Sequence, residues 1–263
     1  MRPPRRLPAA VAALAVLALA GCGGADDPSS GADTDTVRGT VTVFAAASLT
    51  ESFGTLGRQF EAAHPGTRVT FNFAGSSALA TQITQGAPAD VFASAAPGPM
   101  RTVTEAGDAA GEPAVFVRNQ LVIAVPKENP ERVTGLADLI RPGTKVALCA
   151  PQVPCGEAAG KALDNSGVRL TPVTLEQDVK GALAKVKLGE VDAALVYRTD
   201  VRATPELTAV EFPESAGAVN DYPIVVLTAA GNPAGARAFV AYVRSDAGRA
   251  VLTDAGFQPP PVG

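Results

Sequence analysis

The residues with the clearest chemical potential stand where a strand gives way to a helix. Residues 41–44 form an apolar strand pattern, and three alanines lead from it to Ser48. Ser48 and Glu51 have the spacing of a capping box, a hydroxyl at the helix start followed three residues later by a glutamate. A serine at a helix start lies beside unpaired backbone N–H groups, which together suit an anion. For this stretch taken alone, an ordinary capped helix without a ligand is the favoured interpretation.

The same arrangement recurs three times along the chain. Ser76 follows a strand pattern and opens a helix, Cys155 follows a strand and a loop, and Asp178 precedes Val179 at the start of another helix. Each helix start carries roughly half a positive charge. If several of them converge on one cleft, they could hold a dianion without any lysine or arginine.

Enzyme chemistry is poorly supported by the residues present. His64 is the only histidine and stands in a His-Pro-Gly turn, so a Ser-His-Asp triad would depend on that turn residue as its base. The sequence contains no nucleophile elbow, phosphate-binding Walker loop or zinc-protease motif. With three cysteines and one histidine, ligands for a metal ion are also scarce. The sequence predicts neither an enzyme nor a resident cofactor.

The beginning of the chain has the features of an export signal. Basic residues are followed by an apolar run at 7–20 and by small residues before Cys22. This pattern resembles the lipobox of bacterial lipoproteins and implies a signal peptide over 1–21 and a lipid on Cys22. Residues 22–37 are expected to form a flexible tether, because their small, polar and acidic side chains cannot bury a core. A plain signal peptide with an accidental cysteine is the alternative.

Composition limits the partners of the exported part. The whole chain has a net charge of −4, which becomes −7 when residues 1–21 and their three arginines are removed; it lacks tryptophan and has 5% aromatic residues. An acidic, weakly aromatic surface is a poor match for nucleic acid or for an anionic membrane. Contact with a membrane is therefore expected only through the lipid anchor.

Strand and helix patterns alternate after residue 39. This alternation predicts an α/β fold with mainly parallel sheets covered by helices, and the continuous apolar run at 121–125 is typical of a strand buried on both faces. The predicted strands are 41–44, 68–73, 90–93, 121–125, 145–148, 193–197 and 224–227, and the predicted helices are 49–63, 78–85, 101–106, 136–140, 157–163, 179–188 and 234–243.

Cys149 and Cys155 remain as a pair in the exported part. An oxidising compartment favours a structural disulfide, and the five-residue spacing fits neither a redox motif nor a zinc site. Such a bridge would stiffen the loop at 150–154. Two buried thiols are the alternative.

Six segments together resemble the periplasmic molybdate-binding proteins, which are the solute-binding subunits of molybdate ABC importers. The segments occur in the family order from residue 39 to 257, and they are FAAASL (44–49), FAGSSALATQI (73–83), GAPADVF (86–92), APQVPCG (150–156), QDVKGALAKV (177–186) and ALVYRTD (194–200). The resemblance implies a two-lobed periplasmic-binding-protein fold of type II, with two crossing strands and a mostly parallel sheet in each lobe. It places one lobe at 38–119 with 226–263 and the other at 120–225.

The resemblance also implies a ligand set for molybdate, and for tungstate as well. Ser48 and Ser76 would each give a hydroxyl and a backbone N–H, Cys155 and Val179 would give backbone N–H groups, and Tyr197 would give its phenolic O–H. The family often has alanine where this chain has Cys155. No direct bond from protein to molybdenum is expected. The implied partner is the membrane permease of an importer, and the implied protein is a monomer, exported and lipid-anchored.

The chemistry of this set agrees with a proton-free dianion. Such an ion only accepts hydrogen bonds, and the set contains only donors. Asp178 is expected to turn toward the N2 or N3 amide of its own helix rather than toward the ligand. Glu51 is expected to point away from the Ser48 N–H when molybdate is bound, since that amide cannot serve both.

Three other functions fit parts of this pattern. The first is a receptor for another oxyanion such as sulfate. The second is an exported hydrolase with Ser48 or Ser76 as nucleophile, which lacks a credible base. The third is a scaffold lipoprotein that binds nothing small.

Overall fold

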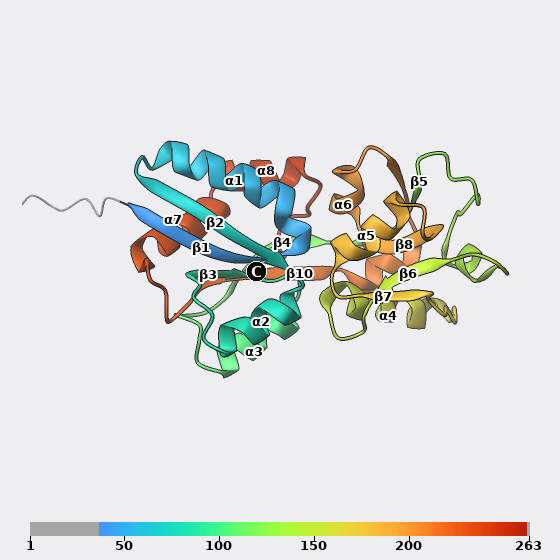
Figure 1. Ribbon diagram of the computed structural model, residues 1–263, viewed down its shortest axis with the longest axis horizontal. Coiled ribbons are helices and arrows are strands. Elements are labelled where there is room, and N and C mark those ends of the chain that lie inside the picture. The colour runs from blue at the N-terminus through green and yellow to red at the C-terminus, as the bar shows by residue number, and fades with distance from the viewer. Residues whose placement is uncertain (1–36, 262–263) are drawn as a thin grey trace, which may run out of the picture. The chain divides into compact units, whose positions relative to one another are not determined.

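The computed structural model describes residues 37–261. The predicted signal peptide, Cys22 and nearly all of the predicted tether lie outside these residues. In the described part, the strands form two five-stranded sheets with helices around each of them (Figure 1).

The first sheet has the strand order β2-β1-β3-β10-β4. β1 is parallel to β2 and β3, whereas β10 is antiparallel to β3 and β4. Its strands are β1 (Gly39–Ala46), β2 (Thr67–Ala74), β3 (Val91–Ala93), β4 (Ala114–Asn119) and β10 (Asn220–Val226). The accompanying helices are η1 (Ala47–Leu49), α1 (Thr50–Ala63), α2 (Ser76–Thr84), α3 (Pro97–Glu105), α7 (Pro233–Arg244) and α8 (Asp246–Asp254).

The second sheet has the order β7-β6-β8-β5-β9. β6 is parallel to β7 and β8, and β5 is antiparallel to β8 and β9. Its strands are β5 (Leu121–Pro126), β6 (Val146–Cys149), β7 (Thr174–Glu176), β8 (Ala193–Tyr197) and β9 (Leu207–Val210). The accompanying helices are η2 (Leu136–Ile140), α4 (Pro154–Ser166), α5 (Val179–Lys187), α6 (Arg198–Arg202) and η3 (Pro213–Ala218).

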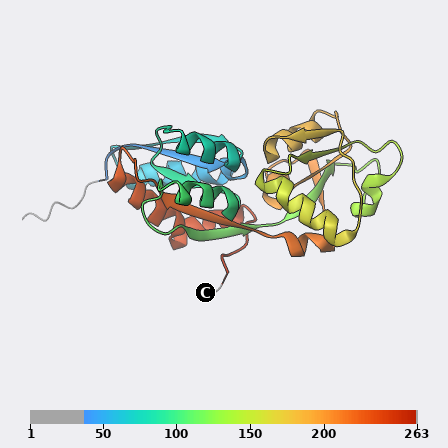
Figure 2. The ribbon, with the colours of Figure 1, turned by 90° about the horizontal axis from the view of Figure 1, so that it is seen from below.

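Both sheets are mixed, where the sequence predicted mostly parallel ones. The strands that carry the chain from one sheet to the other run against their neighbours, and this produces the antiparallel pairings. β4 ends at Asn119 and β5 begins at Leu121, so Gln120 alone connects the sheets at that point. β10 is the return strand and pairs with β4 beside the same crossing (Figure 2).

The division into lobes remains a prediction, but the sheets locate its crossings. The first predicted crossing, between 119 and 120, coincides with the end of β4. The second was placed at 226, whereas β10 already pairs within the first sheet from Asn220, which lies opposite Asn119. β10 thus lies almost wholly in a segment that the sequence had given to the second lobe.

The core explains why these elements are stable where they are. In β5, residues 121–124 are fully buried, as the continuous apolar run predicted. Around the first sheet, aromatic rings of α1 and α7 pack edge to face, with 5.3 Å between the ring centroids of Phe60 and Phe239. Two well-packed sheets thereby hold the connecting loops at fixed positions.

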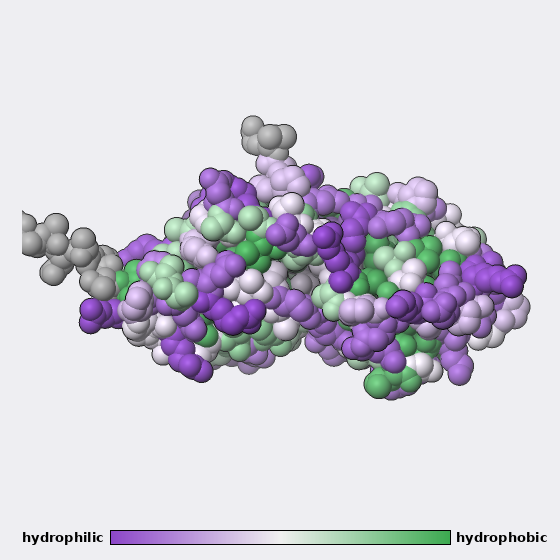
Figure 3. Space-filling view, turned by 90° about the horizontal axis from the view of Figure 1, so that it is seen from above, coloured by the Kyte–Doolittle hydropathy of each residue, from purple (hydrophilic) through white to green (hydrophobic). Residues whose placement is uncertain are grey.

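One face of the molecule is mostly polar. Figure 3 shows a face on which hydrophilic residues predominate and hydrophobic ones form smaller areas. No helix within residues 37–261 has both the length and the apolar character needed to span a membrane.

Candidate functional site

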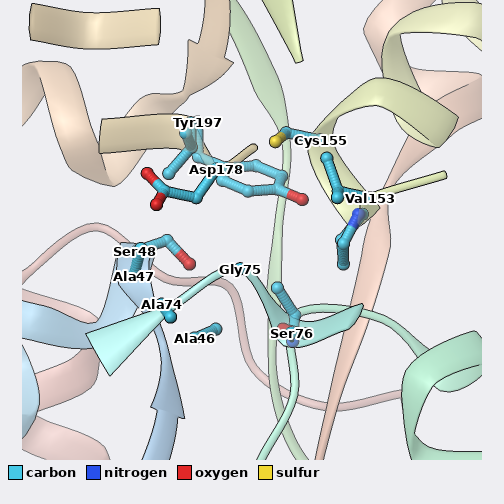
Figure 4. A pocket seen from close by; sticks show the side chains of 13 residues that line it. Ala46, Ala47, Ser48, Ala74, Gly75, Ser76, Val153, Cys155, Asp178 and Tyr197 are labelled. Carbon is cyan, nitrogen blue, oxygen red and sulfur yellow. Dashed lines mark hydrogen bonds between the residues drawn. The ribbon is translucent and has the colours of Figure 1, made fainter. Parts of the chain in front are cut away.

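A small cavity lies between the N-terminal ends of helices that accompany the first sheet and of helices that accompany the second. Its volume is about 10 Å³, measured as the space open to the centre of a water molecule. All five predicted residues line it, namely Ser48, Ser76, Cys155, Val179 and Tyr197. Figure 4 shows the labelled side chains in two groups facing each other, with Ser48 and Ser76 on one side and Cys155, Asp178 and Tyr197 on the other.

The cavity is lined by the starts of helices and not by cationic side chains. Ser76 is the first residue of α2, Cys155 the second of α4 and Val179 the first of α5, while Ser48 lies in η1 just before α1. The N–H groups of a first helical turn have no acceptor inside the helix and carry a partial positive charge. The described residues that line the cavity include no lysine or arginine. The arrangement therefore attracts an anion through neutral donors.

Two glycines permit the close approach of backbone segments at the cavity. A Cβ at Gly75 would lie 2.4 Å from the carbonyl oxygen of Gln177, which belongs to the segment before α5. A Cβ at Gly156 would lie 1.9 Å from the carbonyl oxygen of Ala150. Any side chain at either position would push these segments apart.

A disulfide closes the loop that carries Cys155. Cys149 and Cys155 are bonded, with 5.7 Å between their Cα atoms. The Val153 N–H donates to the Ala150 oxygen at 3.0 Å inside this ring. From the first sheet's side, the Ser77 hydroxyl donates to the Gln152 oxygen at 2.8 Å. These bonds fix the loop and the start of α4 against the start of α2.

The predicted capping box at Ser48 is wrong. No side chain caps η1 or α1, and α1 begins only at Thr50. The Ser48 hydroxyl instead lies 2.9 Å from the Tyr222 hydroxyl on β10. The Glu51 carboxylate accepts from Lys180 Nζ at 2.8 and 2.9 Å. Partners distant in the chain compete successfully for both side chains, which leaves the Ser48 amide free of Glu51.

The expected orientation of Asp178 is confirmed. Its Oδ1 atom accepts from the Gly181 N–H at 3.0 Å, so it caps its own helix at the N3 amide. One carboxylate at the cavity is thereby turned to its own backbone.

The other two hydroxyls of the set are buried and hydrogen-bonded. Ser76 Oγ accepts from the Ala95 N–H at 3.0 Å. The Tyr197 oxygen accepts from Asn220 Nδ2 at 2.8 Å. Burial raises the pKa of Tyr197 well above its usual value, so the phenol keeps its proton. Burial raises the pKa of Tyr222 in the same way.

Three residues behind the cavity were not predicted from the sequence. Tyr222 and Asn220 come from β10, and Asn119 comes from the end of β4. Asn119 Nδ2 donates to the Tyr222 oxygen at 3.4 Å. No local pattern marks these residues, because they meet the cavity only through strand pairing between segments about 100 residues apart.

Beside the cavity, a lysine links two carboxylates. Lys180 follows Val179 in the chain. Its Nζ forms ion pairs with Glu51 Oε1 at 2.8 Å and with Asp200 Oδ1 at 3.1 Å. Burial alone would lower the pKa of Lys180, but the Asp200 and Glu51 carboxylates together raise it. Burial raises the pKa of Asp200 to about 6 against the opposing effect of Lys180. The contact with Lys180 is an ion pair only, since neither Asp200 oxygen has a hydrogen bond within the described residues.

The chain belongs to the bacterial extracellular solute-binding proteins, whose family model matches residues 41–258. These are transport receptors, and the prediction that the chain is not an enzyme is confirmed. Within this class it resembles molybdate receptors in particular. It is 47% identical over 251 residues to the molybdate-binding protein ModA of Mycobacterium tuberculosis. The aligned region covers 95% of this chain and 96% of that relative.

Two further comparisons bear on the family and on the fold. A putative ABC transporter substrate-binding lipoprotein of Bacillus subtilis, YvgL, is 31% identical, with 94% of this chain and 96% of the relative covered. The periplasmic molybdate-binding protein of Azotobacter vinelandii superposes with a TM-score of 0.73 at 20% identity, with 84% of this chain and 100% of that chain covered. The predicted two-lobed type II fold is thereby confirmed.

Proposed function

We propose that this protein captures molybdate in the cavity between its two sheets and delivers it to an ABC importer. The single observation that carries the proposal is the convergence of five donor positions on one cavity that lacks cationic side chains. The close sequence relationship to molybdate-binding proteins supports molybdate as the ligand.

The proposed roles follow from the chemistry of each position. Ser48 and Ser76 give a hydroxyl and an amide each, Cys155 and Val179 give amides, and Tyr197 gives its hydroxyl. A hydrogen bond to a charged group contributes about 1.5–3 kcal/mol, so several neutral donors can bind a dianion tightly once water is excluded. The protein contacts only the oxygens of the ion and makes no bond to molybdenum. Tungstate presents the same oxygens and is bound in the same way.

The importer and the anchor complete the proposal. A substrate-binding receptor of an ABC importer delivers its ligand to a membrane permease. We place this receptor outside the cytoplasmic membrane as a monomer held by a lipid on Cys22, which lies outside the described residues. The small residues before Cys22 and the lipoprotein among the relatives support this anchor.

The test is direct titration of the purified mature chain with molybdate, tungstate, sulfate and phosphate, by calorimetry and by shift of the melting temperature. Ser48→Ala and Ser76→Ala should each weaken molybdate binding at least about tenfold, which corresponds to one lost hydrogen bond of about 1.4 kcal/mol. Ser166→Ala is a matched control, because that hydroxyl lies near the end of α4, where it donates to the Leu163 oxygen and accepts from the Val168 N–H.

Two results would contradict the proposal. If both serine variants bound molybdate with wild-type affinity, this cavity would not be the molybdate-binding site. Equal affinity for sulfate and molybdate would replace the molybdate receptor by a general oxyanion receptor, which a donor-only cavity also permits.

A further inference from the structure

Each of the three hydroxyls that line the cavity is bonded to a group behind it. For Ser76, that group is the Ala95 N–H, which can only donate. The Ser76 oxygen therefore accepts this bond and keeps its own proton for another partner. The hydrogen bond behind each hydroxyl therefore determines whether that hydroxyl presents its proton or a lone pair to the cavity.

The same holds for Tyr197 through Asn220. Asn220 Nδ2 lies 2.8 Å from the Ala95 oxygen and 3.3 Å from the Pro154 oxygen, and both of these carbonyls only accept. These contacts fix the orientation of the amide. Its nitrogen cannot accept, so the third contact of Nδ2, at 2.8 Å, is also a donation to the Tyr197 oxygen, and one of the two protons is shared between two acceptors. The phenolic proton of Tyr197 is then free to point into the cavity that the residue lines.

Ser48 is controlled by a longer relay. The Gln120 N–H donates to Asn119 Oδ1 at 3.0 Å and so fixes that amide as well. Asn119 Nδ2 then donates to the Tyr222 oxygen. Tyr222 keeps its own proton for the Ser48 oxygen, 2.9 Å away, and Ser48 keeps its proton for the cavity. A bound dianion reinforces this direction, because it is a stronger acceptor than a phenol.

We propose that Tyr222, with Asn119 behind it, and Asn220 determine specificity by holding the cavity hydroxyls as donors. The inference rests on the proposed function and deepens it. An anion that retains a proton, such as hydrogen phosphate, must donate that proton to an acceptor or leave it unpaired in a closed site. With every hydroxyl proton directed inward and Oδ1 of Asp178 bonded to its own helix, the three hydroxyls that line the cavity offer no such acceptor. Tyr222 does not line the cavity and acts as a positioning residue through Ser48.

The decisive variant is Tyr222→Phe, which removes one hydroxyl and retains the ring. Without the Tyr222 proton, Ser48 can rotate and present a lone pair to the cavity. Molybdate and sulfate should both bind roughly tenfold more weakly, the value of one hydrogen bond. Hydrogen phosphate should bind as well as before or better, so the molybdate-to-phosphate affinity ratio falls by about tenfold.

The assay is calorimetric titration at mildly alkaline pH, with molybdate, sulfate and phosphate in the same buffer. All three ions are then tetrahedral dianions, and only phosphate carries a proton. A purely structural role of Tyr222 would weaken all three ions by the same factor. Tyr242→Phe is the matched control, because the Tyr242 hydroxyl bonds Gln59 Oε1 at the surface, 3.1 Å away. Melting temperatures of each variant without ligand report whether it is folded.

Asn119→Asp provides a second, independent variant. Its second oxygen accepts where Nδ2 donated, so Tyr222 turns to donate to it and Ser48 turns to donate to Tyr222. The Gln120 N–H keeps its acceptor, and the Thr199 hydroxyl, which accepts from Nδ2 at 2.9 Å, can rotate to donate. The added charge repels all three dianions alike, so the affinity ratio remains the measure, and it should fall as in Tyr222→Phe.

An unchanged molybdate-to-phosphate ratio in the folded variants would overturn the inference, as would phosphate binding that stays undetectable while molybdate binding is lost. Failure of the wild-type protein to bind molybdate would instead refute the proposed function. The two failures are therefore distinguishable in one set of titrations.

Discussion

Asp200→Asn should remove a pH dependence from the stability of this protein. The Asp200 side chain is completely inaccessible to solvent and is neutralised only by its ion pair with Lys180. Burial raises its pKa from 3.8 to about 6 in spite of that lysine. Asparagine has nearly the same shape and does not titrate, so it isolates the contribution of the ionised carboxylate.

The magnitude follows from the difference between the two pKa values. In the unfolded chain the group titrates near 3.8 and in the folded protein near 6, a difference of about 2 pKa units. At about 1.36 kcal/mol per unit, the ionised group costs the folded state roughly 3 kcal/mol at pH 7. Between these pKa values the folded protein binds more protons than the unfolded chain. The contribution of Asp200 to the free energy of unfolding therefore decreases as the pH rises through this window and is constant above it.

Urea unfolding of the ligand-free protein at a series of pH values tests this reasoning. Between pH 7 and pH 5 the wild-type protein should gain about 1 kcal/mol of unfolding free energy relative to Asp200→Asn. Asp254→Asn, at an exposed carboxylate, should run parallel to the wild type over the same range. If Asp200→Asn also runs parallel to the wild type, Asp200 does not titrate in this window and the argument from burial is refuted.

Two other predictions concern the contacts beside the cavity. Glu51→Gln should accelerate molybdate release two- to fivefold in stopped-flow measurements, because Glu51 on α1 and Lys180 on α5 form a half-exposed ion pair worth about 0.2–1 kcal/mol between helices of the two sheets. An unchanged release rate would show that this ion pair does not hold the two sides of the cavity together. Replacing Cys149 and Cys155 by serine should lower the free energy of unfolding by about 2 kcal/mol in urea, because the small disulfide ring restricts the unfolded chain. A wild-type value in that double variant would show that the loop is held by its hydrogen bonds alone.

The sequence predicted the elements whose patterns are long and buried. The apolar run at 121–125 and the strand that ends at Tyr197 both lie in the second sheet as expected. β7 and β9 were missed because they are short and partly exposed, with Leu175 49% exposed on β7. β4 was missed because its mixed composition has no clear alternation.

At the site, the sequence predicted the residues that line the cavity but not the residues that these contact. The motifs identified five residues that prove to line one cavity. The capping interpretation of Ser48 failed because it considered only neighbours in the chain, whereas Tyr222 stands 174 residues away. Tyr222 and Asn220 were invisible for the same reason, since strand register, and not local sequence, brings them behind the cavity.

The lack of cationic side chains at the cavity has a kinetic consequence. Helix ends act over only about one turn, so a distant ion experiences the net charge of the mature chain, which is −7 once residues 1–21 and their three arginines are removed. A dianion is repelled during its approach and attracted only on arrival. At 0.1 M, dissolved salt screens that repulsion beyond about 10 Å, whereas the short hydrogen bonds between the cavity and the bound ion are hardly affected. Capture of the ion should therefore become faster as salt is added, the opposite of what a lysine-lined site would show.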